Sequence, residues 1–101
     1  MSIESIYRWH DGGLAALEYC DMTDTVIEVA DSWFVGDGRV LALDVHRSRF
    51  LRSMPAAVRE ATRAEEFWSS VVALLPREGE WFPRVELQRR GDARLLVFRT
   101  P

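Results

Sequence analysis

A chain of 101 residues is long enough for one hydrophobic core and too short for two. Its composition, 48% hydrophobic and 29% charged, excludes a disordered chain, and its net charge of −3 lacks the basic footprint of a nucleic-acid-binding domain. No apolar run reaches the roughly 18 residues of a membrane span, and the first ten residues carry charges where a signal peptide needs an apolar stretch. We therefore expect a single cytoplasmic domain, residues 1–101, with neither nucleic acid nor membrane as partner.

All 13 basic residues are arginine, and the chain has one cysteine, Cys20. A lone cysteine cannot form an internal disulfide, which fits a reducing compartment. Arginine binds carboxylates and phosphates through two parallel hydrogen bonds, but it stays protonated and cannot serve as a Schiff-base amine. The sequence therefore excludes, for this chain alone, any mechanism that needs an internal lysine.

The first half of the chain predicts strands. We expect one strand over residues 14–19, after the turn residues Asp11-Gly12-Gly13, and a clearer one over residues 26–35. The Gly36-Asp37-Gly38 turn and a further strand over residues 39–45 would complete a β-hairpin. The alternation of residues 26–35 divides them between two faces: Ile27, Val29, Trp33 and Val35 on an apolar face, and Glu28, Ala30, Ser32 and Phe34 on the other.

Asp31 shares the apolar face of this strand. A carboxylate buried there must find hydrogen-bond donors or change its pKa. We interpret Asp31 as a structural hydrogen-bond anchor, with general acid–base catalysis as the alternative.

The second half of the chain predicts two helices and then two strands. Residues 46–53 favour a short helix, and Ser53 would cap a longer helix that has Pro55 in its first turn and ends at Pro76. The longer helix carries apolar residues at helical spacing: Val58, Ala61, Ala64, Trp68, Val71, Val72 and Leu75. Residues 81–89 and 94–99 would form a hairpin around Gly91-Asp92. The predicted fold is α+β, with an antiparallel sheet built from hairpins and one short and one long helix packed on one face.

Residues 30–50, ADSWFVGDGRVLALDVHRSRF, resemble the N-terminal lobe of the class IV aminotransferases, which depend on pyridoxal phosphate. This family includes branched-chain and D-amino-acid aminotransferases and aminodeoxychorismate lyases. Its pattern is a strand, a turn with a residue–Gly pair, a second strand, and His-x-x-Arg followed by Leu or Phe, which here is His46-x-x-Arg49-Phe50. Residues 82–87 and 95–99 are also similar to the last two strands of that lobe, so the resemblance covers about residues 26–101.

The resemblance implies roles for five residues. Arg49 would bind the cofactor phosphate, for which the guanidinium fork is suited. The amino-acid or oxo-acid substrate would be faced by Ala30, Ser32 and Phe34, with His46 near the cofactor. Several relatives carry a substrate-side tyrosine where this chain has Ala30, so the resemblance leaves the substrate open.

The Schiff-base lysine of the family lies in a second, larger lobe, which we expect to follow Pro101 in a complete enzyme. No residue of this chain would then be catalytic, and the chain would not be an active enzyme alone. The complete enzyme, an aminotransferase or a lyase, would be a homodimer.

Two other functions remain open. A stand-alone, non-catalytic module of the same fold would bind a partner or a second copy through strand edges and the face that the second lobe covers. A small anion-binding protein would use the cluster of Arg47, Arg49 and Arg52. His46 would instead cap or pack a helix in either case, and no His, Cys, Asp or Glu spacing indicates a metal site.

Overall fold

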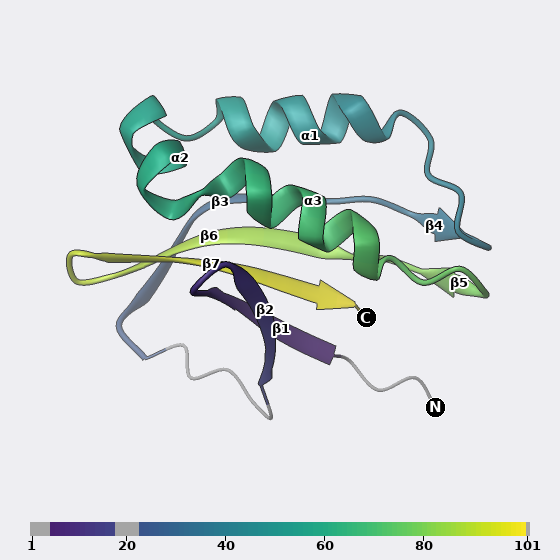
Figure 1. Cartoon of the computed structure of the whole chain (residues 1–101), viewed down its shortest axis with the longest axis horizontal. Helices are drawn as coiled ribbons and strands as arrows, with labels where there is room; N and C mark the ends of the chain where they lie inside the picture. Colours follow the sequence, from purple (N-terminus) through teal and green to yellow (C-terminus); the bar gives the residue numbers. More distant parts are fainter. Residues whose placement is uncertain (1–4, 18–22, 101) are drawn as a thin grey trace.

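The protein is a two-layer α+β domain, described here from a computed structural model that defines residues 5–17 and 23–100 (Figure 1). In chain order, its elements are β1 (Ser5–His10), β2 (Gly13–Leu17), β3 (Thr25–Ser32), β4 (Val35–Gly36), α1 (Leu43–Arg52), α2 (Ala56–Thr62), α3 (Ala64–Leu74), β5 (Glu80–Trp81), β6 (Arg84–Arg90) and β7 (Ala93–Thr100). The predicted residues 18–19 of the first strand, and Cys20, lie outside the described part of the chain.

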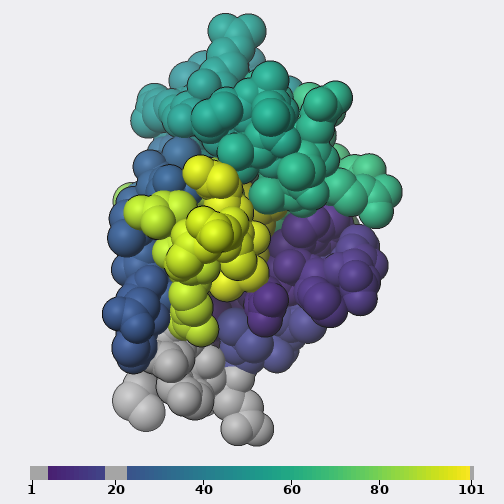
Figure 2. All heavy atoms as spheres, turned by 90° about the vertical axis from the view of Figure 1, so that its left-hand side faces the viewer, coloured from purple at the N-terminus to yellow at the C-terminus, as the bar shows by residue number. Residues whose placement is uncertain are grey.

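Five of the strands form one antiparallel sheet in the order β2-β1-β7-β6-β3. Viewed from its turn, the β6–β7 hairpin lies between β3 on one side and β1–β2 on the other, beneath the helices (Figure 2). β4 and β5 pair separately, through Val35 and Trp81. The predicted α+β class and the second hairpin, which turns at Gly91-Asp92, are confirmed.

The three helices pack on one face of this sheet, as predicted (Figure 1). α1 contacts β3, α2 contacts β7, and α3 contacts both β2 and β7. The core between the layers consists of buried apolar side chains from both: Trp33, Val35, Phe50, Leu51, Met54, Ala64, Phe67, Trp68, Val71, Val85, Leu87, Leu96 and Phe98. Burial of these side chains is the main favourable contribution to folding.

The predicted first hairpin is wrong, because residues 39–45 do not form a strand. Only Arg39 pairs with Gly36, through two backbone hydrogen bonds of 3.0 and 3.1 Å, and the chain then enters α1 at Leu43. Leu43, Phe50 and Leu51 face inward at helical spacing, whereas Leu41 is 90% exposed. The helical spacing of the apolar residues therefore decides the structure from Leu43 onward, and the strand that the alternation of Leu41, Leu43 and Val45 predicted does not form.

The predicted long helix is also interrupted. α2 ends and α3 begins at Arg63, which adopts a left-handed conformation with φ 57°. Pro55 precedes the first residue of α2, while Ser53 lies at the end of α1 instead of capping the next helix. The break lets α2 and α3 follow different directions over the sheet (Figure 1).

A β-bulge between Ile27 and Val29 corrects the predicted faces of β3. Ile27 pairs with Gln88, while Val29 pairs with the next residue of β6, Leu87. One extra residue in β3 reverses the alternation at this point. Consequently Val29 packs against the core, whereas Ile27 is partly exposed on the opposite face.

Candidate functional site

A buried carboxylate, an imidazole and a guanidinium meet where β3 passes under α1. The Asp31 side chain is only 7% exposed, and its Oδ2 lies 3.0 Å from Nδ1 of His46. Its Oδ1 lies 3.6 Å from an Nη of Arg49 and accepts a 2.9 Å hydrogen bond from the backbone N–H of Ser32. The interpretation of Asp31 as a buried hydrogen-bond anchor agrees with these contacts.

Helix α1 presents His46 and Arg49 to Asp31 from one face. Residues three apart in a helix lie on the same side, so both side chains reach a single residue of β3. α1 starts after Ala42, which has a left-handed φ of 54° and accepts hydrogen bonds from the backbone N–H groups of Val45 and His46. Arg49 and Arg52 lie in the last turn, where positive charge is favourable for the helix dipole.

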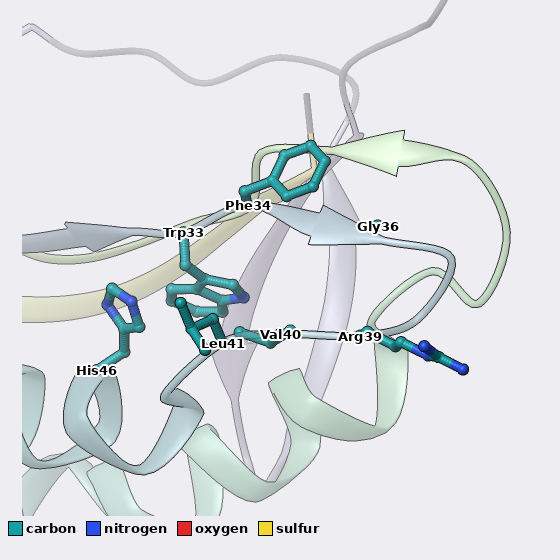
Figure 3. A pocket seen from close by; sticks show the side chains of 7 residues that line it. All are labelled: Trp33, Phe34, Gly36, Arg39, Val40, Leu41 and His46. Atoms are coloured by element: carbon teal, nitrogen blue, oxygen red, sulfur yellow. The ribbon is translucent and has the colours of Figure 1, made fainter.

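The first of two hollows beside this cluster lies between the β3–β4 segment and the start of α1, and we call it the β4–α1 hollow. It has a volume of about 580 Å³ and is lined by Trp33, Phe34, Gly36, Arg39, Val40, Leu41 and His46 (Figure 3). Trp33 forms its buried floor, with its ring centroid 5.7 Å from that of His46, and its indole N–H has no hydrogen-bond partner among the described residues. Leu41 and Phe34 are exposed. The hollow is therefore mainly apolar, with His46 and Arg39 as its polar groups.

The second hollow, which we call the α1 hollow, lies along the exposed side of that helix. It has a volume of about 520 Å³ and is lined by Asp44, Val45, Ser48, Arg49, Arg52 and Ser53. The Arg49 side chain is 59% exposed and has an ion pair only with Asp31 among the described residues. Two guanidinium groups and the Ser48 hydroxyl at one depression form a donor set suited to phosphate or another oxyanion, whereas the Ser53 hydroxyl donates to the backbone carbonyl of Arg49 at 2.6 Å.

The structure divides the predicted substrate-facing residues into two groups. Phe34 and His46 line the β4–α1 hollow together. Ala30 and Ser32 instead lie on the other face of the sheet, because Ala30 pairs with Glu86 and Ser32 pairs with Arg84, whereas the intervening Asp31 points toward α1. Phe34 does not follow this alternation, because β3 ends at Ser32 and Phe34 lies beyond the strand.

A polar cluster, which was not among the predicted site residues, lies on the sheet face opposite the helices. Glu86 is buried and lies 2.6 Å from Arg84 Nε, 2.8 Å from Gln88 Nε2 and 3.4 Å from Arg99 Nε. Burial raises the pKa of Glu86, but the hydrogen bonds from Arg84 and Gln88 and the positive charges of Arg99 and Arg84 outweigh it, so its pKa is lowered from 4.5. The alternation of Arg84, Glu86 and Gln88 with apolar residues was the signal for this cluster.

Within residues 5–17 and 23–100, no three His, Cys, Asp or Glu side chains are grouped so that they could hold a metal ion. None of the helices in this part of the chain is long and apolar enough to cross a membrane. A comparison with protein-family models finds no match, and a search of curated proteins finds no relative.

Proposed function

We propose that this domain is the small lobe of a cytoplasmic, pyridoxal-phosphate-dependent aminotransferase or lyase that acts on amino acids. In this proposal, the lysine that carries the covalent chemistry belongs to a second lobe, because the 101 residues contain none. The domain contributes cofactor-phosphate and substrate contacts, and the complete enzyme is a homodimer. The sequence resemblance at His46-x-x-Arg49-Phe50 motivates the proposal.

The observation that carries the proposal is that Arg49 is both ion-paired and exposed. Its guanidinium lies against the buried Asp31 carboxylate and yet stays 59% exposed in the α1 hollow. A guanidinium anchored at one side keeps N–H donors for a phosphate, and Arg52 adds a second positive charge to the same hollow. The donor set therefore fits a phosphate group.

The residues of this chain would bind and orient the reactants. Pyridoxal phosphate, when bound, supplies the electron-withdrawing ring, while the protein supplies orientation and electrostatics. Arg49 would hold the phosphate group. Trp33, Phe34 and Leu41 would contact an apolar substrate side chain in the β4–α1 hollow, and His46, which lines the hollow and contacts Asp31, would offer it a polar group.

The proposal can be tested with pyridoxine 5′-phosphate, which has the cofactor's phosphate but lacks the aldehyde that reacts with amines. We expect it to shift the side-chain Nε–H resonance of Arg49 in the 101-residue chain, and pyridoxine without phosphate not to do so. Arg49→Ala should weaken binding by about tenfold or more, the value of a lost charge-assisted hydrogen bond.

Arg47→Ala provides the matched control, because Arg47 is an exposed arginine of α1 that does not line the α1 hollow. It should leave binding within about twofold of the unaltered chain, as expected for an exposed, salt-screened charge outside the hollow. Equal binding of pyridoxine and its phosphate, or equal losses in the two variants, would contradict the proposal.

A stand-alone interaction module is the second candidate, and exposed apolar side chains favour it. Leu41 is 90% exposed, and Phe34 and Phe82, which lie across from each other by continuation of the Val35–Trp81 pairing, are both 52% exposed. Contiguous exposed apolar groups are typical of interaction surfaces. If light scattering shows a dimer that Leu41→Ser dissociates, and Arg49 does not respond to the phosphate, this second function is favoured over the first.

A further inference from the structure

We infer that Asp31 is a positioning residue, which fixes the ring tautomer of His46 and holds the guanidinium of Arg49 ready for an anion. The part that concerns Arg49 rests on the proposed function, because it assumes that Arg49 binds a phosphate. The part that concerns His46 depends only on the contacts within the domain.

Because Asp31 is buried, its carboxylate requires hydrogen-bond donors or positive charges close by. A carboxylate that is 7% exposed must be compensated by donors, since an uncompensated buried charge is strongly unfavourable. Two hydrogen bonds reach it, from the Ser32 backbone N–H and from Nδ1 of His46, and the Arg49 guanidinium adds an ion pair at 3.6 Å. Both side chains are thereby held toward β3, because rotation of His46 would remove a hydrogen bond from Asp31 and rotation of Arg49 would remove a compensating positive charge.

For His46, the contact selects one of two tautomers. An ionised carboxylate can only accept hydrogen bonds, so Nδ1 must carry the proton that it donates to Oδ2. In the neutral ring, Nε2 is then an acceptor, and no hydrogen bond engages it within the described residues. Because His46 lines the β4–α1 hollow, the hollow presents this acceptor to a ligand N–H or O–H group.

For Arg49, the ion pair with Asp31 restricts the motion of the side chain but leaves most of the guanidinium N–H groups able to bind an anion. The 3.6 Å separation from Oδ1 is an ion pair rather than a hydrogen bond, and it engages one Nη atom. A long side chain that is already held loses less conformational freedom when an anion binds. Asp31 should therefore raise the affinity of Arg49 for phosphate, although a negative charge close to the site would by itself lower it.

The two effects of Asp31 on phosphate affinity, positioning of Arg49 and electrostatic repulsion, have opposite signs and can therefore be distinguished. Asp44→Asn is the matched control. Asp44 is an exposed acid of α1 that lines the α1 hollow with Arg49, and within the described residues no hydrogen bond or ion pair joins it to His46. Asp31→Asn and Asp44→Asn each remove one negative charge near Arg49. Electrostatics alone predicts tighter phosphate binding in both variants, whereas positioning predicts weaker binding in Asp31→Asn only.

The experiment combines two NMR measurements on the 101-residue chain. Ring ¹⁵N shifts, recorded well above the measured titration midpoint of His46, report the tautomer, and inorganic phosphate is titrated while the Arg49 Nε–H is observed. We expect the Nδ1–H tautomer in the unaltered chain and in Asp44→Asn, and a mixture of tautomers in Asp31→Asn, because the asparagine amide can meet Nδ1 with either its oxygen or its NH2 group. Phosphate binding should weaken about three- to tenfold in Asp31→Asn and stay equal or become tighter in Asp44→Asn.

An Nε2–H tautomer in the unaltered chain would overturn the inference without any variant, as would unchanged phosphate affinity in a folded Asp31→Asn. If Asp31→Asn does not fold, Asp31→Glu replaces it, and the retained carboxylate should preserve the Nδ1–H tautomer. If the unaltered chain shows no phosphate response at Arg49, the proposed function and the Arg49 part of the inference both fail. The His46 part is still decided by the ring shifts alone.

Discussion

Arg84 and Glu86 are two residues apart on β6 and form the shortest contact of the polar cluster, 2.6 Å between Nε and Oε2. Residues separated by two in a strand point to the same face, so the pair forms without any tertiary partner. Arg99 of β7 and Gln88 complete the surroundings of Glu86. A buried carboxylate is thus held mainly by the two central hairpin strands.

Stability should fall in acid because of Glu86. Its pKa is lowered in the folded state, so its ionised form contributes stability that is complete above about pH 4.5 and is lost as the pH falls through the folded-state pKa. Glu86→Gln should reduce this dependence in urea unfolding at a series of pH values, and cost about 1–3 kcal/mol at pH 7. Glu65→Gln, a change at an exposed carboxylate of α3, should preserve the acid dependence, and a similar loss of dependence in both variants would argue against Glu86 as its source.

Ala42→Gly should stabilise the domain. Ala42 has a φ of 54°, a conformation that costs a residue with a Cβ about 1–2 kcal/mol and glycine almost nothing, while glycine adds entropy to the unfolded chain. We expect a net gain of about 0.5–1 kcal/mol from thermal unfolding. Ala61→Gly in α2, where the backbone is helical, should instead cost about 0.5–1 kcal/mol, so the two changes should have opposite signs.

Phe67→Ala should be among the most destabilising substitutions. The Phe67 ring is fully buried and contacts the rings of Trp9 and Phe50 at centroid distances of 5.9 and 6.2 Å. Removing it leaves a cavity, and the expected loss in denaturant unfolding is about 3–5 kcal/mol. Phe34→Ala deletes the same atoms at a position that is 52% exposed, so it should cost less than about 1 kcal/mol; equal losses would place the core elsewhere.

Gly38→Ala and Gly91→Ala should differ, although both residues have positive φ. A Cβ at Gly38 would lie 3.3 Å from the Cα of Arg77, whereas one at Gly91 would meet nothing within 4 Å. Both variants incur a backbone cost of about 1–2 kcal/mol, and only Gly38→Ala adds a tight contact with the Arg77 backbone, which must shift to relieve it. Thermal unfolding should therefore rank Gly38→Ala as the less stable variant, and the reverse order would contradict the packing of Arg77 on the turn.

The elements that depend on local signals were predictable. Gly91-Asp92 between two alternating apolar runs indicated the β6–β7 hairpin, and helical spacing indicated that residues 56–74 are mainly helical. The left-handed Arg63 was not predictable, because an arginine gives no sign of positive φ. The start of α1 was not predicted, because the few apolar residues from Leu41 to Val45 fit both the two-residue period of a strand and the 3.6-residue period of a helix.

The candidate site was predictable only in part. The position of Asp31 on the apolar face followed from alternation, and the resemblance drew attention to His46 and Arg49. That one carboxylate contacts both of them depends on the crossing of β3 and α1, fifteen and more residues apart, which no local pattern contains. The opposite placement of Ala30 and Ser32 likewise required the position of α1 to be known.

The last strand along the chain is the middle strand in space. In the part of the chain that the structure describes, β7 joins β1 on one side and β6 on the other, and no strand pairing joins the β1–β2 ribbon directly to the β3–β6 ribbon. Assembly must therefore wait for the C-terminal strand, and a ribosome-bound chain truncated before Ala93 should remain sensitive to protease.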